Sequence, residues 1–282
     1  MAAAVCSSRS RRPIVVAAVA LALALVGCGG GGSEQAVAEP GVVPETVTTT
    51  GSTTTTVAVT STTSIDEVRG PQDDGLRRVL LVGDSLTFGA IPALDEELSA
   101  QGVETRYVGF SATGLLSGQG WWNREITAQV EAWHPDVVVI EACCNYANGE
   151  PEYVDAAGQT VAADSEQMYT EWAAMAADAV ARAGEEGAEV LWVTTPCVVE
   201  WEGSGTTATR VAMFNAISAG LGVELVDWAG ALCPDGEFAS TLEVDGVDVA
   251  VRADDGLHLT DAGDAVVAEV TWATIRPYLD GT

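Results

Sequence analysis

Two short segments, far apart in the sequence, carry the residue types that nucleophilic catalysis needs. Ser85 follows the apolar run 79–82, within the sequence Gly-Asp-Ser-Leu-Thr. A serine hydroxyl is a weak nucleophile and needs a base, usually histidine. His258 stands three residues after Asp255, in Asp-Gly-Leu-His, and an aspartate at this spacing on a turn can accept the second ring N–H. The pattern predicts a Ser85–His258–Asp255 triad for acyl transfer.

The alternatives to these residues are few. The chain has two histidines, which excludes a metal site built on several histidines and leaves His134 as the other candidate base. His134 precedes Pro135 at the end of a helix-like segment, which favours a role at a helix C-terminus. Asp254 is the alternative orienting carboxylate, with a less suitable spacing. A histidine base must be neutral, so activity is expected to fall below about pH 6.5.

The two segments together resemble a known enzyme family. Gly-Asp-Ser-Leu at 83–86 and Asp-x-x-His at 255–258 resemble the first and last sequence blocks of the GDSL, or SGNH, hydrolases. The resemblance extends from about residue 77 to the end of the chain. It implies a flavodoxin-like fold and a serine esterase or acylhydrolase that needs no metal or organic cofactor.

The resemblance also implies three donors to an oxyanion hole. They are the backbone N–H groups of Ser85 and Gly114 and the side-chain amide of Asn145. Gly109 competes with Gly114, and either glycine is also explained by a turn that needs positive φ. Asn145 stands in Cys-Cys-Asn-Tyr, where the family usually has Gly-x-Asn-Asp. These departures concern the loop around Asn145 and not the triad.

Positioning these residues requires alternating strands and helices. Beyond residue 76, short segments rich in Val, Leu and Ile predict strands over 78–82, 104–108, 137–142, 189–194 and 224–228. Amphipathic segments between and after them predict helices over 91–100, 123–133, 165–183, 208–220 and 261–278. This order predicts an α/β fold, a three-layer α/β/α sandwich around a flavodoxin-like five-stranded parallel sheet. Ligands bind such sheets beyond the carboxyl ends of the strands.

The N-terminal region differs in composition from the rest. Arginines precede an apolar run of about 13 residues, short for a bilayer span of about 20, which ends in Leu-Val-Gly-Cys. This resembles a bacterial lipoprotein signal and implies export and a lipid on Cys28, with an ordinary signal peptide as the alternative. The expected divisions are a signal over 1–27, a disordered Thr- and Gly-rich tether over 28–75, and a hydrolase domain over 76–282.

The charge of the chain limits its partners. The sequence contains 12 Lys and Arg, all of them Arg, and 41 Asp and Glu, which gives a formal net charge of −29. Such a surface repels phosphate backbones and anionic lipid headgroups, so nucleic acid is excluded as a partner. Contact with a membrane is expected only through the lipidated N-terminus.

Cysteines of the expected hydrolase domain are candidates for disulfides, because an exported domain permits them. They are Cys143, Cys144, Cys197 and Cys233. A bond between adjacent cysteines is strained, so Cys143 and Cys144 are each expected to pair with Cys197 or Cys233. A zinc site is the alternative, although no Cys-x-x-Cys spacing is present.

The sequence predicts an exported, lipid-anchored serine esterase that acts on carboxylic esters. Trp121, Trp122 and Trp201 lie near the expected mouth of the site, where exposed rings can stack on sugars, although core packing is the favoured interpretation. The substrate class suggested by this location is an acylated, for example O-acetylated, carbohydrate. An O-acyltransferase with the same site and a catalytically idle binding module are the alternatives.

Overall fold

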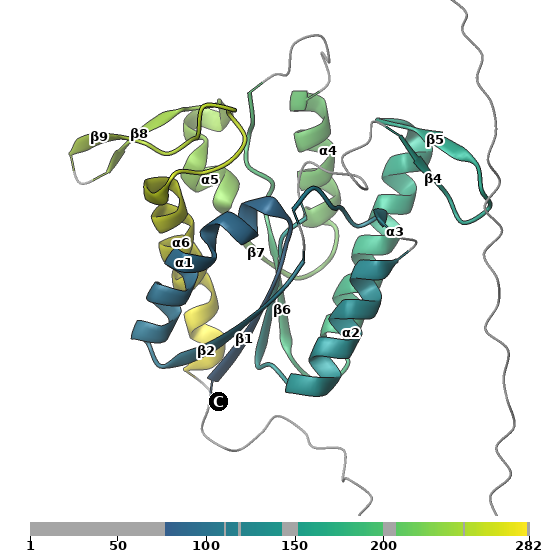
Figure 1. Ribbon diagram of the computed structural model, residues 1–282, viewed down its shortest axis with the longest axis horizontal. Coiled ribbons are helices and arrows are strands. Elements are labelled where there is room, and N and C mark those ends of the chain that lie inside the picture. Colours follow the sequence, from purple (N-terminus) through teal and green to yellow (C-terminus); the bar gives the residue numbers. More distant parts are fainter. Residues whose placement is uncertain are drawn as a thin grey trace, which may run out of the picture. The chain divides into compact units, whose positions relative to one another are not determined.

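A five-stranded parallel sheet forms the centre of the fold (Figure 1). The computed structural model describes residues 77–109, 111–117, 120–142, 152–199, 207–244 and 246–280. The strands of this sheet are β1 (Arg77–Val82), β2 (Val103–Val108), β3 (Val137–Ile140), β6 (Glu189–Val193) and β7 (Glu224–Val226). Their order is β2-β1-β3-β6-β7, all parallel, which confirms the predicted flavodoxin-like sheet.

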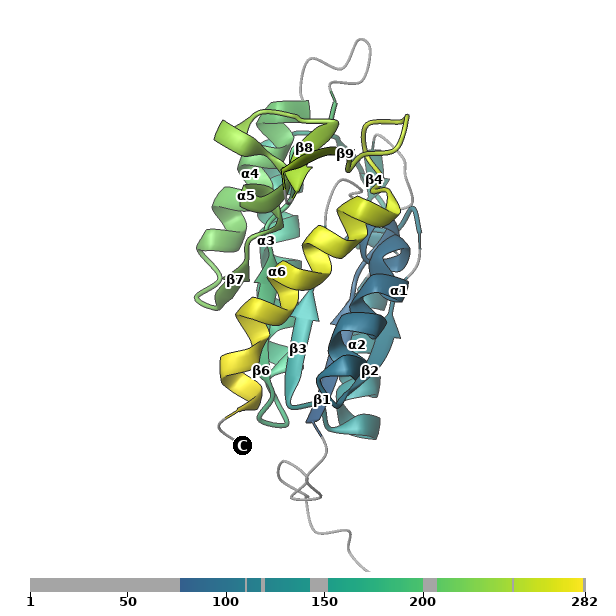
Figure 2. The ribbon, with the colours of Figure 1, turned by 90° about the vertical axis from the view of Figure 1, so that its left-hand side faces the viewer.

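Helices cover both faces of the sheet (Figures 1 and 2). One face packs on α1 (Ser85–Ala100), α5 (Trp228–Leu232) and α6 (Asp261–Leu279), and the other on α2 (Trp121–Trp133), α3 (Glu166–Ala183) and α4 (Thr207–Ala219). Every residue of β3 is buried, because a strand in the middle of such a sandwich has helices on both sides. The three-layer prediction is therefore confirmed.

Helix α1 begins at Ser85, six residues before the predicted start at residue 91. The Asp84 carboxylate accepts the N–H of Leu86 at 3.0 Å and caps the first turn. Pro92 lies inside the helix without ending it. This earlier start matters for function, because the candidate nucleophile is the first residue of a helix and not part of a preceding loop.

Three predicted strands end earlier than expected, β6 by one residue, at Val193. Strand β3 stops at Ile140 instead of residue 142, and the Glu141 side chain that follows it accepts the backbone N–H of Asp84. Strand β7 stops at Val226 instead of residue 228, because Asp227 caps α5 by accepting the N–H of Gly230 at 2.8 Å.

Two antiparallel hairpins were not predicted. One consists of β4 (Glu152–Val154) and β5 (Thr160–Ala162), and the other of β8 (Thr241–Val244) and β9 (Val247–Ala250). A short helical turn, η2 (Pro234–Gly236), precedes the second hairpin. Strands of three or four residues are too short to show a period-2 pattern in the sequence.

The buried tryptophans belong to the core. Trp122, Trp172, Trp192 and Trp228 are all essentially inaccessible to solvent. The core interpretation of Trp122 is therefore confirmed, and sugar stacking on this ring is excluded. Trp121 is half-buried at the start of α2, and Trp201 lies outside the described residues.

The predictions for residues 1–76, namely the signal peptide, the lipid on Cys28 and the tether, lie outside the described residues. Within the part of the chain that is described, no helix combines the length and the apolar character needed to cross a bilayer.

Candidate active site

Ser85, the candidate nucleophile, lies at the point in the sheet where the strand order reverses. The chain passes from β1 to β2 on one side and later returns to β3 on the other side of β1. Ser85 follows β1 at this point, at the carboxyl edge of the sheet, where α/β folds place their ligands. Within the described residues the backbone N–H of Ser85 has no acceptor, and it stands at the positive end of α1.

The tight turn before Ser85 depends on glycine. A Cβ atom on Gly83 would lie 2.1 Å from Oγ1 of Thr87, and a Cβ on Gly109 would lie 1.7 Å from the carbonyl oxygen of Gly83. Gly109 also has a φ of 141°, which favours glycine. The close contact of Gly109 with the Gly83 carbonyl is enough to explain why residue 109 is a glycine.

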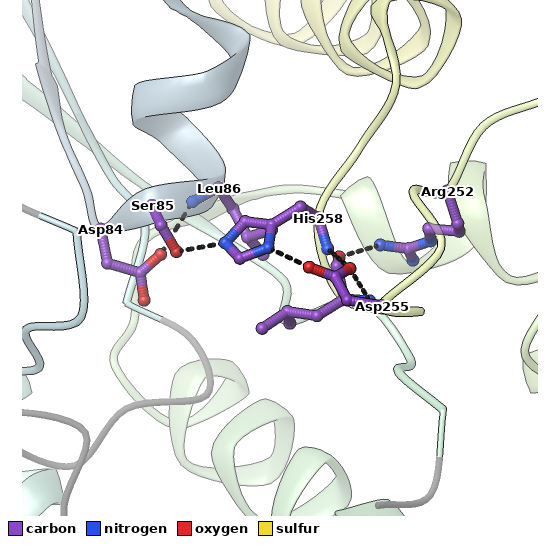
Figure 3. A network of polar contacts seen from close by, with 7 residues as sticks. Asp84, Ser85, Leu86, Arg252, Asp255 and His258 are labelled. Atoms are coloured by element: carbon purple, nitrogen blue, oxygen red, sulfur yellow. Dashed lines mark hydrogen bonds and ion pairs between the residues drawn. The ribbon is translucent and has the colours of Figure 1, made fainter.

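The three triad residues come together (Figure 3). Nε2 of His258 lies 2.9 Å from Oγ of Ser85, and Nδ1 of His258 lies 2.6 Å from Oδ2 of Asp255. A carboxylate can only accept, so Nδ1 carries the hydrogen and Nε2 is free to accept the serine proton. The arrangement is that of a nucleophile, a general base and an orienting carboxylate.

Asp255 is held by its own loop. Its Oδ1 accepts the backbone N–H groups of Leu257 and His258, both at 2.9 Å. The hydrogen bond from the His258 ring, followed by these two backbone bonds, lowers the pKa of Asp255 to about 2. Asp255 is therefore a carboxylate at any pH at which the enzyme would work. Asp255, and not the alternative Asp254, makes the contact with the histidine.

His134 has a different place in the fold. It is the C-cap of α2, with a φ of 48°, and its Nδ1 lies 3.7 Å from a carboxylate oxygen of Glu186. Helix α2 runs antiparallel to the strands, so its C-terminus lies at the amino edge of the sheet, away from Ser85. The predicted role of His134 at a helix end is confirmed.

Of the two further predicted oxyanion donors, Gly114 lies within the described residues and Asn145 does not. The N–H of Gly114 donates to Oγ of Ser117 at 2.9 Å, and the N–H of Ser117 donates back to the carbonyl of Gly114 at 2.8 Å. Gly114 is therefore available to an oxyanion only after Ser117 releases it. Asn145 lies outside the described residues, as do Cys143 and Cys144.

A buried acidic pair supports the nucleophile turn, and sequence reasoning missed one of its members. Glu141 and Asp84 are each 2% exposed. Oε2 of Glu141 accepts the backbone N–H of Asp84 at 3.0 Å and the hydroxyl of Thr87 at 3.1 Å. Burial, and next the nearby Asp84 carboxylate, raise the pKa of Glu141 well above its ordinary value. The hydroxyl of Tyr107 donates to the Gly83 carbonyl at 2.9 Å and completes the support.

Two substitutions of Glu141 should separate its shape from its charge. Glu141→Ala leaves two buried donors without an acceptor, each worth about 1–3 kcal/mol, and should lower the melting temperature by about 5–15 °C. Glu141→Gln keeps an acceptor oxygen and should cost about a third as much. Calorimetry of both variants against the wild type is the measurement, and equal losses would mean that an ionised carboxylate is required.

The raised pKa of Glu141 also predicts a pH effect on stability. Above the ordinary carboxyl pKa of about 4.3, the folded protein keeps a proton that the unfolded chain releases. Wild-type stability should therefore fall as the pH rises through this range, and the fall should be smaller for Glu141→Gln. Unfolding at pH 5 and pH 8 tests this.

The disulfide differs from the predicted pairing. Cys197, after β6, is bonded to Cys233, at the end of α5, and their Cα atoms lie 6.1 Å apart. The expectation that each of these residues pairs with Cys143 or Cys144 is wrong. The carboxyl end of β6 and the end of α5 lie side by side because β6 and β7 are neighbouring strands. In the described part of the chain, no group of three or more His, Cys, Asp or Glu is placed to bind a metal.

The family described as "Protein of unknown function (DUF459)" matches residues 78–273. A comparison with curated protein sequences finds no match.

This chain is similar to several solved structures. A candidate acylhydrolase from Bacteroides fragilis has 18% identity and a TM-score of 0.51, covering 76% of this chain and 92% of its own. A GDSL-like lipase from Bacteroides thetaiotaomicron has 14% identity and a TM-score of 0.48, with coverages of 73% and 88%. A psychrotrophic esterase from Pseudoalteromonas has 15% identity and a TM-score of 0.48, with coverages of 72% and 99%. With the SGNH hydrolase fold in place and a family match over more than half of its length, the chain belongs to the DUF459 family.

Proposed function

We propose that this protein is a serine acylhydrolase that cleaves carboxylic esters through a covalent acyl-enzyme. The observation that carries the proposal is the continuous chain of hydrogen bonds from Ser85 through His258 to Asp255. A complete triad at the carboxyl edge of the sheet argues against a catalytically idle binding module.

The first half of the reaction forms the acyl-enzyme. Oγ of Ser85 attacks the ester carbonyl carbon while its proton passes to Nε2 of His258. Asp255 stabilises the imidazolium that results and remains ionised itself. The negative oxygen of the tetrahedral intermediate is stabilised by the N–H of Ser85 at the start of α1, with Gly114 and Asn145 as the further proposed donors. The intermediate collapses, the alcohol leaves, and His258 returns the proton to it.

The second half releases the acid. A water molecule loses its proton to His258 and attacks the acyl carbon, after which Ser85 recovers its hydrogen. The side chains of His258 and Asp255 are 43% and 51% exposed, so water reaches the base without any opening motion. Water therefore has access as the second nucleophile, as hydrolysis requires.

The cellular setting is part of the proposal. A disulfide in the folded domain supports the export that the N-terminal sequence indicates, because such bonds persist in oxidising compartments. We propose attachment to the outer face of the cell membrane through Cys28 and a substrate among acylated carbohydrates of the cell surface or its surroundings.

Hydrolysis and transfer are distinguished by adding an acceptor. With p-nitrophenyl acetate and no other alcohol, the protein should release nitrophenol and acetate in equal amounts over many turnovers. Adding an oligosaccharide acceptor should leave the nitrophenol rate unchanged. Release that depends on the acceptor, with acetylated sugar as the product, would instead identify an O-acyltransferase.

A further inference from the structure

One buried charge lies behind the catalytic loop. Arg252 is 4% exposed, and within the described residues its guanidinium has no carboxylate partner. Burial lowers its pKa to about 10, so it remains a cation at neutral pH. Burying a guanidinium without an opposite charge is costly unless its donors are used. Nη1 and Nη2 of Arg252 both donate hydrogen bonds, which offset part of this cost, while its buried Nε has no hydrogen-bond partner in the described residues.

The guanidinium of Arg252 joins two separate segments, and Figure 3 shows its contact with the Asp255–His258 loop. Nη1 donates to the carbonyl of Leu257 at 3.1 Å, and Nη2 donates to the carbonyl of Cys197 at 2.9 Å. Leu257 lies between the two catalytic residues of the loop and is the direct neighbour of His258. Cys197 belongs to the segment after β6, and in the described residues no hydrogen bond joins it to Asp255 or His258. Arg252 therefore connects the catalytic loop to a different part of the fold.

The same two segments also meet through the backbone. The N–H of Val199 donates to the carbonyl of Gly256 at 3.2 Å. Gly256 has a φ of 68°, and a Cβ there would lie 2.5 Å from Cγ1 of Val199. The catalytic loop thus rests directly on residues 197–199, with no space for another side chain between them.

The disulfide holds the segment on which the loop rests. Cys197 is bonded to Cys233, whose own N–H donates to the carbonyl of Ala229 in α5 at 3.0 Å. Cys233 is buried. The position of the Cys197 carbonyl, the acceptor for Arg252, is therefore tied covalently to the end of α5.

We propose that Arg252 and the Cys197–Cys233 disulfide act as one bracket that positions the Asp255–His258 loop against Ser85. Arg252 is a positioning residue, since it contacts the loop backbone and not the reacting atoms. The proposal rests on the proposed esterase activity for its kinetic readout. A shift of about 1 Å in a catalytic group can cost about 100-fold in rate, so loss of the bracket should lower kcat by about 10- to 100-fold with a smaller change in KM.

The first measurement is p-nitrophenyl acetate hydrolysis by the full-length protein and its variants. Arg252→Met keeps the stem and removes both hydrogen bonds, and it should show the full loss of kcat. Arg252→Lys keeps the charge and one donor and should recover part of it. Arg78→Met is the matched control, because Arg78 is also buried but lies at the amino end of β1. It should leave kcat within about twofold of the wild type.

A double-mutant cycle tests whether the two parts form one unit. Replacing both Cys197 and Cys233 with serine should lower kcat severalfold. Adding Arg252→Lys to that variant should lower kcat by less than a further twofold, because the anchored acceptor is already lost. Losses that multiply would overturn the proposal, and so would an Arg252→Met variant that keeps wild-type kcat. If Arg252→Met does not fold, the double-mutant cycle that uses Arg252→Lys tests the proposal by itself.

An NMR measurement separates this proposal from the proposed activity. The Nδ1 proton of His258, bonded to Asp255, should give a resonance far downfield in the wild type and in a His134→Gln variant, which lacks the other histidine. Arg252→Met should weaken or remove it, and Arg78→Met should not. A wild type with this resonance but no ester turnover would contradict the proposed function alone. A resonance unchanged in Arg252→Met would contradict the bracket.

Discussion

Ser85→Ala is expected to lower kcat for p-nitrophenyl acetate by about 10⁴-fold or more. The Ser85 hydroxyl is the atom 2.9 Å from the base, and alanine leaves nothing there to form an acyl-enzyme. The N–H of residue 85 still polarises the carbonyl, so a small residual rate is expected from water attack. Alanine is a good helix former, and the melting temperature should remain within about 2 °C.

Covalent labelling provides the second measurement for this variant. A fluorophosphonate should add its phosphorus to Oγ of Ser85 with loss of fluoride, so intact-mass analysis should show one adduct in the wild type and none in Ser85→Ala. Because Ser85→Ala is expected to keep the wild-type melting temperature, the absence of an adduct on this variant would not be due to unfolding. A variant that keeps more than about one hundredth of the wild-type kcat would place the nucleophile elsewhere.

The meeting of Ser85, His258 and Asp255 could be predicted because each of them follows from local sequence. Ser85 comes directly after an apolar strand, and the Asp255–His258 spacing closes a turn by itself, with both backbone bonds to the carboxylate inside the loop. The strand order then brings the two segments together, because α1, which begins at Ser85, and α6, which follows His258, pack beside each other on one face of the sheet. Only the alternation of strands and helices was needed for that step.

The residues that support the triad could not be predicted, since their roles depend on long-range contacts. Glu141 lies 57 positions from the backbone N–H that it accepts, and Arg252 lies 55 positions from its acceptor Cys197. In the sequence, each is one charge beside an apolar or turn segment, a pattern typical of a solvated surface. The disulfide pairing was missed for the same reason, because it depends on where α5 ends beside β6.

The two sides of the site are supported in different ways. The nucleophile side rests on a buried acidic pair, with Glu141 holding the turn before Ser85. The base side rests on a buried cation and a disulfide, with Arg252 holding the loop before His258. The 2.9 Å contact between Ser85 and His258 joins residues that are 173 positions apart in the sequence. Its geometry therefore depends on both supports.

Asp255→Asn is expected to lower kcat by about 10³- to 10⁴-fold while the loop keeps its shape. The asparagine oxygen can still accept the backbone N–H groups of Leu257 and His258. Its amide, however, presents a donor to Nδ1 of His258. The ring then moves its hydrogen to Nε2, which can no longer accept the serine proton. Asp254→Asn is the matched control, one residue away, and should retain wild-type kcat.

The pH profile adds an independent measurement to this comparison. The pKa of Asp255 is about 2, so this group does not titrate between pH 4 and pH 9. The general base must be unprotonated to accept from Ser85, so a single group should limit the wild type on the acid side. The logarithm of kcat/KM should rise with a slope of one as the pH increases. A slope of two, or a loss in Asp254→Asn equal to that in Asp255→Asn, would mean that a second carboxylate takes part in the proton transfer.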